Sequence, residues 1–172
     1  MASTKAIGEA VRDAGAYLTE HSDQARYRDA HARAHLVSGL RVTVDGPGGE
    51  HLETDMPKGI GGSAAAPSPG WYFRAATAAC VASLIGIRAA AIGIALEPSS
   101  VEVMVDSESD DRGILGLDAT IPAGALSVKI VVGIRSRTAD RASLEELVGW
   151  AVEHCPVTDT VTRTVPVEVV VG

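Results

Sequence analysis

Residues 68–92 read SPGWYFRAATAACVASLIGIRAAAI, and this stretch predicts one long helix. Ser68 is a suitable N-cap, and Pro69 suits the first helical position, where a missing N–H has no partner to lose. Alanine, leucine and isoleucine occupy every side of the projected helix, and only Arg74 and Arg88 carry charge. A helix that is apolar nearly all round is typical of a buried helix. Because the stretch is interrupted and short of large apolar residues, we do not expect a membrane span.

The segments on either side of this helix follow strand and turn patterns. Turn-forming residues at 45–49 and a Gly- and Pro-rich loop at 57–69 separate the alternating segments. Thr138 or Asp140 is a suitable cap for a late helix, and Pro156 can begin another. We expect strands at 35–37, 40–44, 50–55, 100–106, 126–134 and 165–171, and further helices at 4–20 and 141–153. The fold class is therefore α+β, with antiparallel strands in two groups around a buried central helix.

The composition limits the functions that the chain can serve. A net charge of −7 argues against nucleic acid as a partner, because phosphate binding needs a basic face. Neither a basic amphipathic helix nor an apolar signal segment is evident, so we expect a cytoplasmic protein that does not bind membranes. Aromatic residues make up only 3% of the chain, so small aliphatic side chains must build the core. Such a core favours burial against a partner subunit.

Cys80 and Cys155 are the two cysteines of the chain, and they are the candidates for chemistry. A structural disulfide is not expected in the cytosol, and two inert buried thiols are the common alternative. Cys155 precedes Pro156 at a predicted helix start, where free N–H groups favour a thiolate. Cys80 lies in mid-helix and needs a nearby cation. Arg74 is six positions away, on another face of the helix, so Arg41 on a predicted strand is the better candidate.

Other kinds of site are not supported by the sequence. His154 beside Cys155 does not form a recognised spacing of metal ligands. The Gly-x-Ser-x-Gly pattern of a serine hydrolase is absent. The acidic residues at 106–111 lack the calcium-loop pattern and are typical of a solvated loop.

The order of these elements resembles the OsmC/Ohr family (osmotically inducible protein C and organic hydroperoxide resistance proteins). The resemblance rests on Ala-Ala-Cys at 78–80 in the central helix and on Cys-Pro-Val at 155–157. It implies an OsmC-like domain at residues 31–172, preceded by an N-terminal helical extension and linker at 1–30. The hydroperoxide-resistance branch carries a glutamate after its Asn-Pro, whereas this chain has Gly70 after Ser68-Pro69. The chain thus resembles a divergent member.

What the resemblance implies is a cysteine-based peroxidase. Members of the family are intertwined homodimers that reduce organic hydroperoxides with a thiol pair, without a metal or organic cofactor. By position, Cys80 would attack the peroxide and Cys155 would resolve the product into a disulfide, which an external dithiol of the lipoyl type resets. Arg41 is the nearest match to the family's activating arginine. Two alternatives remain open: a non-catalytic protein that binds an apolar ligand at the dimer interface, and a thiol redox sensor.

Overall fold

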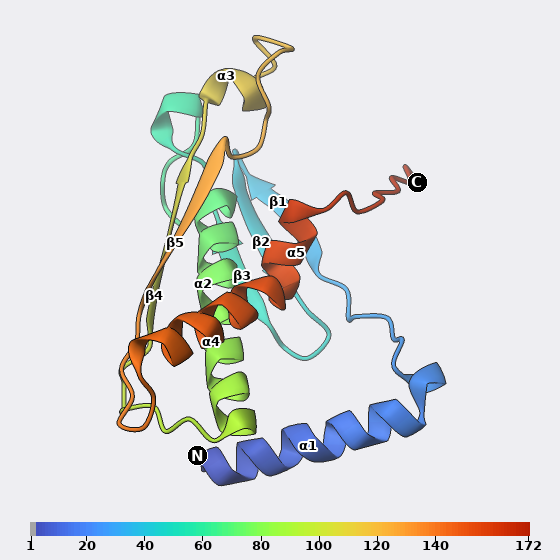
Figure 1. Cartoon of the computed structure of the whole chain (residues 1–172). Helices are drawn as coiled ribbons and strands as arrows, with labels where there is room; N and C mark the ends of the chain where they lie inside the picture. Colours follow the sequence, from blue (N-terminus) through green and yellow to red (C-terminus); the bar gives the residue numbers. More distant parts are fainter. Residues whose placement is uncertain (1–2) are drawn as a thin grey trace. The chain divides into compact units, whose positions relative to one another are not determined.

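The computed structural model describes residues 3–172 of the chain and divides it into two compact units. The first unit joins residues 3–14 to residues 76–172, and the second holds residues 15–75. The elements follow in the order α1 (Thr4–Glu20), β1 (Arg33–Ser38), β2 (Arg41–Asp45), β3 (His51–Thr54), α2 (Pro69–Ile92), β4 (Glu102–Glu108), α3 (Asp111–Ile114), β5 (Ser127–Gly133), α4 (Arg141–Glu153) and α5 (Pro156–Thr162). Figure 1 shows them along the chain. The structure confirms the α+β class and the two antiparallel groups of strands.

The long helix α2 begins and ends where the sequence predicts. Ser68 Oγ accepts a hydrogen bond from Trp71 N–H at 3.3 Å, next to Pro69 in the first position. Gly93 follows the helix with φ +76°, and Ile94 N–H then bonds the Ala89 carbonyl at 2.9 Å. This left-handed turn closes the helix end, and glycine adopts it without strain.

One stripe of α2 is buried, which corrects the expectation of a helix covered on every side. The buried residues are four apart and lie on one face: Thr77, Val81, Ile85 and Ala89. Ile87 on another face is 37% exposed. The sequence-based argument against a membrane span is also wrong in its premise, because α2 is long and apolar enough to cross a membrane by length and composition. Core helices of soluble proteins meet the same criterion.

The core of the first unit forms where α4 packs on the buried stripe of α2. Leu147 and Ala151 from α4 join Val81 and Ile85 from α2, and all four are at most 2% exposed. Cys155, directly after α4, completes this cluster. Figure 1 shows α4 crossing α2 beside the β4–β5 pair. Alternate residues of these two strands face the cluster: Val103, Ile130 and Val132.

Within the first unit, helix α1 contacts α2 through a glycine. A Cβ atom on Gly8 would lie 2.6 Å from the Ala90 carbonyl oxygen of α2. Only glycine permits so close an approach of the two helix backbones. Gly8 is accordingly the buried residue of α1, and Ser3 Oγ caps the helix by accepting a hydrogen bond from Ala6 N–H at 3.2 Å. The predicted helix at 4–20 is confirmed.

The second unit contains the predicted meander β1–β2–β3. Antiparallel pairing sets Leu36 opposite Val42 and Val44 opposite Leu52, with an irregularity between Leu36 and Ser38. Every residue of β1 is exposed, including Leu36 at 68%. A three-stranded sheet with an exposed apolar strand lacks the cover that such a sheet needs for stability.

The predicted strand at 165–171 does not form. Within the described chain these residues have no strand partner, and Val167, Val169, Val170 and Val171 are 81–92% exposed. Alternating valines favour an extended chain, but a strand is stable only when its backbone groups pair with another strand. The prediction of a strand at 165–171 is therefore wrong for the described chain.

A buried carboxylate holds the loop that leads to α2. Asp55 is 2% exposed. Its Oδ2 accepts hydrogen bonds from Ala65 N–H at 3.0 Å, Ser63 N–H at 3.1 Å and Ser63 Oγ at 2.5 Å, while Oδ1 accepts one from Met56 N–H at 2.8 Å. These donors, Ala65 first, lower the pKa of Asp55 from 3.8 to about 2. The charged form of Asp55 therefore stabilises the folded loop.

Asp55→Asn should lower the thermal midpoint of unfolding at neutral pH, because an amide accepts these hydrogen bonds poorly. The folded-state pKa lies below the unfolded one, so the stabilisation is complete above about pH 4 and disappears as the pH falls towards 2. The difference between wild type and variant should shrink over the same range in a thermal melt series. Asp29→Asn, at an exposed linker position, is the control. A pH-independent difference would contradict this role of Asp55.

Candidate functional site

The fold brings the two cysteines together in the first unit. Cys80 lies in the middle of α2, next to Val81 of the buried stripe, and Cys155 lies in the cluster that covers that stripe. The two thiols are close enough for each to shift the pKa of the other. Both are free thiols in this structure, with Cys80 half-buried and Cys155 fully buried. The two residues that sequence analysis selected are thus direct neighbours.

The junction between α4 and α5 positions Cys155. His154 ends α4, and Cys155 is the N-cap of α5, with Pro156 in the first position of the new helix. Thr158 Oγ1 lies 2.5 Å from the Val152 carbonyl and 3.0 Å from the Cys155 carbonyl. One side chain therefore links the last turn of α4 to the first turn of α5. The prediction that Cys155 stands at a helix start is confirmed.

The pKa values of the two thiols shift in opposite directions. Burial raises the pKa of Cys80, and the hydrogen bond to Cys155 and the negative charge of Cys155 raise it further. Burial also acts to raise the pKa of Cys155, but hydrogen bonds from Thr158 N–H, Cys80, the Thr158 hydroxyl and Val157 N–H outweigh it and lower that pKa.

Arg41 lies on the meander of the second unit, whereas Cys80 lies in the first unit. On its own sheet Arg41 Nη2 forms an ion pair with Glu53 Oε2 at 2.6 Å, across the β2–β3 ladder. Glu53 was not predicted from the sequence, in which Gly70 stands where a glutamate was expected. The signal was present, because strand pairing places residues near 41 and 53 side by side.

Around Cys155, aromatic and cationic side chains form a stack. The guanidinium carbon of Arg88 lies 4.8 Å from the centre of the Trp150 ring. The His154 imidazole also stacks on Trp150, with 4.1 Å between the two ring centres. His154 Nδ1 is also 2.8 Å from the Trp150 carbonyl, which fixes the imidazole on α4. Within residues 3–172 no group of three or more histidine, cysteine or acidic side chains is arranged to hold a metal ion.

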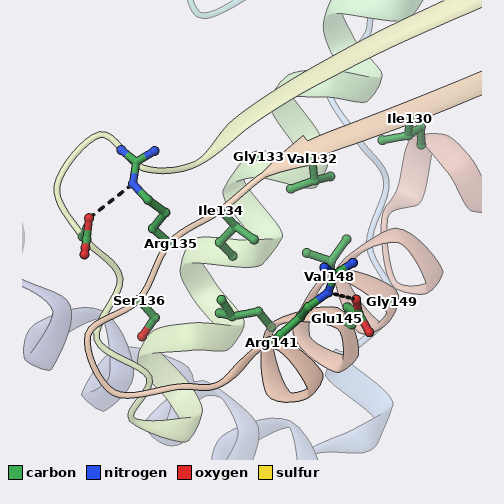
Figure 2. Close-up of a pocket in the computed structure, with 12 residues that line it drawn as sticks. Ile130, Val132, Gly133, Ile134, Arg135, Ser136, Arg141, Glu145, Val148 and Gly149 are labelled. Carbon is green, nitrogen blue, oxygen red and sulfur yellow. Dashed lines mark hydrogen bonds and ion pairs between the residues drawn. The ribbon is translucent and has the colours of Figure 1, made fainter.

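A separate groove of about 880 Å³ lies between β5 and α4, and neither cysteine lines it. Figure 2 shows Ile130, Val132 and Ile134 from the strand side and Val148 and Gly149 from the helix side. Two ion pairs border the groove: Arg141 with Glu145 at 2.8 Å, and Arg135 with Glu97 at 3.3 Å. The groove is thus apolar inside, and its bordering charges compensate one another.

The family model described as OsmC-like protein matches residues 61–170, which is more than half of the chain. The chain belongs to the OsmC-like family. The match includes both cysteines, α2 and the α4–α5 junction, and it begins after the meander. No curated protein sequence matches the chain significantly.

Solved structures share this OsmC-like fold. An organic hydroperoxide resistance protein OsmC from Legionella pneumophila matches with a TM-score of 0.59 and 24% identity, over 79% of this chain and 90% of that one. An OsmC-like protein from Mycoplasma pneumoniae has a TM-score of 0.66 and 16% identity, over 80% and 89%. An organic hydroperoxide resistance protein from Elizabethkingia anophelis has a TM-score of 0.57 and 18% identity, over 79% and 89%. At these identities the likeness establishes the fold.

A mild thiol oxidant should convert Cys80 and Cys155 into one disulfide within the chain, because Cys80 packs against the cluster that contains Cys155 and each thiol shifts the pKa of the other. Peptide mapping without reduction should show a single cross-linked peptide pair, and thiol titration should fall from two groups per chain to none. A disulfide between two chains, or two thiols that resist oxidation, would contradict the proximity of Cys80 and Cys155 within one chain.

Proposed function

We propose that this protein is a thiol peroxidase that reduces organic hydroperoxides through Cys80 and Cys155. The observation that supports it best is the proximity of two free thiols in an OsmC-like fold. Their unequal exposure supports the order of events. Cys80 is half-buried and accessible to a substrate, whereas Cys155 is 0% exposed and adjoins Cys80. Structural neighbours named as organic hydroperoxide resistance proteins agree with this activity.

In the first step the Cys80 thiolate attacks the distal oxygen of the hydroperoxide. The O–O bond breaks, Cys80 becomes a sulfenic acid, and the other oxygen takes a proton and leaves as the alcohol. The apolar residues around Cys80, such as Val81 and Leu84, favour an organic hydroperoxide over hydrogen peroxide. No metal or organic cofactor takes part in this step.

In the second step Cys155 attacks the oxidised sulfur of Cys80. An S–S bond forms, the S–O bond breaks, and water leaves. An external dithiol, of the lipoyl type or similar, then returns two electrons by thiol–disulfide exchange and restores both thiols. The lowered pKa of Cys155 suits it to this attack, because the thiolate is the nucleophilic form.

Cys155→Ser should still consume one equivalent of an organic hydroperoxide and leave a sulfenic acid on Cys80. Dimedone labelling and mass spectrometry would locate the adduct. Turnover with a dithiol should be lost, because no resolving thiol is present. Cys80→Ser should not consume hydroperoxide at all.

Three other results would contradict this assignment. The reverse pattern would exchange the roles of the two thiols. Equal reactivity of both variants would mean that neither thiol is specially activated, as in a protein that only binds an apolar ligand. Oxidation of the wild type without dithiol-dependent turnover would favour a redox sensor.

The proposal assigns the activation of Cys80 to Arg41, because burial raises the pKa of Cys80 and a cation must oppose that effect. Glu53 holds the Arg41 guanidinium in one orientation through their ion pair and so supplies a carboxylate that Gly70 lacks. This pair gives the chain both charges of an activating arginine–glutamate couple on one sheet.

Arg41→Met should slow the alkylation of Cys80 at neutral pH, by about tenfold for each unit by which its pKa rises. Mass spectrometry of the Cys80 peptide over a pH series measures this rate. Glu53→Gln should give a smaller effect in the same direction, and Arg74→Met should give none. A shift on Arg74→Met, or no shift in any variant, would show that Arg41 is not the partner.

We infer that two copies of this chain form a homodimer. The exposed face of α2, with Ile87, and the exposed strand β1 are apolar surfaces that one chain leaves uncovered. The occupant that fits the groove beside β5 is the segment 165–171 of the second copy. It is apolar, has no strand partner among the described residues, and leaves α5 on the side away from β5 in Figure 1. Strand addition would pair the free edge of β5.

Light scattering at micromolar concentration should give twice the mass of one chain. Val167→Asp, on the face of the segment shared with Val165 and Val169, should weaken the dimer, because it would place a charge in the groove. Val170→Asp lies on the opposite face, beside Glu168, and is the matched control. A stable monomer in the wild type would contradict the dimer. Equal weakening of the dimer by both variants would contradict the binding of segment 165–171 in the groove beside β5.

A further inference from the structure

We propose that Tyr72 is a positioning residue of the Arg41–Glu53 pair: its hydroxyl binds the β3 backbone at Glu53 and fixes that strand on the start of α2. All three residues lie in the second unit. The proposal rests on the proposed function, because it names what places the cation that is assigned to Cys80.

The carbonyl of Glu53 points away from the neighbouring strand. In the described sheet β3 is an outer strand, with β2 on one side. Gly46 N–H donates to the Glu50 carbonyl at 2.9 Å, and in an antiparallel ladder hydrogen-bonded and non-hydrogen-bonded pairs alternate from such a pair onwards. The opposed residues Thr43 and Glu53, three pairs along, therefore form a non-hydrogen-bonded pair. The N–H and carbonyl of Glu53 thus face the outer edge of β3.

Two hydrogen bonds join this outer edge to the chain at the start of α2. Tyr72 Oη donates to the Glu53 carbonyl at 3.0 Å, and Asp55 N–H donates to the Pro67 carbonyl at 3.3 Å. A backbone carbonyl that the sheet leaves unpaired needs another donor when it is shielded from water, and the half-buried Tyr72 supplies one. The Tyr72 hydroxyl therefore replaces a strand partner for Glu53.

The ion pair depends on this backbone contact because its own side chains are open to water. The side chains of Arg41 and Glu53 are 47% and 38% exposed. An ion pair so exposed constrains its partners weakly, so the orientation of the guanidinium depends on where the strand places Glu53. Tyr72 and Cys80 are carried by the same helix, α2. The proposed activation of Cys80 should accordingly be sensitive to the Tyr72 hydroxyl.

Tyr72→Phe removes one oxygen atom and retains the ring, which lies edge-on to the Trp71 ring with 5.2 Å between centres. The chain also offers a matched control. Tyr17 Oη on α1 donates to Gln24 Oε1 at 2.5 Å, so Tyr17→Phe likewise removes one hydroxyl and one hydrogen bond. That bond does not involve the β1–β3 sheet.

The first experiment measures the ion pair without any peroxide chemistry. Phenylglyoxal reacts with guanidine groups whose nitrogen atoms are free, so an ion pair slows the reaction. Peptide mapping should show faster modification of Arg41 in Tyr72→Phe, by about twofold to fivefold, which is the range expected for loss of an exposed ion pair. Glu53→Gln should give the same change, and Tyr17→Phe should give none. Arg141, which pairs with Glu145, is the internal reference, and circular dichroism checks folding.

The second experiment measures the alkylation rate of Cys80 over a pH series. Tyr72→Phe should slow alkylation at neutral pH, as Glu53→Gln does, and by less than Arg41→Met. In an Arg41→Met background, Tyr72→Phe should have no further effect, because the guanidinium that it positions is absent. A general loss of stability would not produce this dependence on Arg41.

Unchanged modification of Arg41 in Tyr72→Phe, or an equal change in Tyr17→Phe, would overturn the proposal. A further slowing of alkylation in the Arg41→Met background would overturn it as well, since Tyr72 would then act on Cys80 by another route. If Arg41→Met itself leaves alkylation unchanged, the activation of Cys80 by Arg41 is wrong. The phenylglyoxal measurement still decides whether Tyr72 positions the ion pair.

Discussion

The packing of α4 on the single buried stripe of α2 is the constraint on which the site depends. Val81 and Ile85 of α2 meet Leu147 and Ala151 of α4, and burial of these side chains is the main source of stability that the first unit shows. Cys80 precedes Val81 and Cys155 follows α4 by two residues, so the same packing sets the two sulfur atoms against each other. The proximity of the two thiols is therefore a consequence of core packing, and no other element is needed to bring the cysteines together.

The two cysteines have different backbone surroundings. Cys80 lies in mid-helix, where burial is the largest effect on its thiol and raises the pKa. At the α4–α5 junction, Pro156 interrupts the helix and leaves the N–H groups of Val157 and Thr158 free to stabilise the Cys155 thiolate. This arrangement is consistent with the proposed resolving role of Cys155, and the raised pKa of Cys80 is the reason for proposing that a cation activates it.

The proposed homodimer would give the uncovered apolar surfaces a common explanation. The meander has an exposed strand, α2 buries one stripe of its circumference, and the C-terminal valines have no partner in the described chain. Small aliphatic side chains bury little area each, so a chain of this size cannot cover all its apolar elements alone. The charge-compensated groove beside β5 accepts an apolar segment without leaving a charge unpaired.

The sequence by itself determined the local structure, because the signals that start and stop its elements act over a few residues. Pro69 and Gly93 bound α2, Asp140 caps α4, and Pro156 begins α5 after Cys155. The family resemblance and the two candidate thiols were likewise evident from short motifs. Tertiary structure decided what depends on residues far apart in the chain: the proximity of Cys80 and Cys155, the Arg41–Glu53 pair, the hydrogen bonds to Asp55 and the unpaired end at 165–171. Hydrogen bonds and charges at those places arise only after packing has brought distant groups within a few ångströms of each other, and a strand pattern becomes a strand only beside a partner.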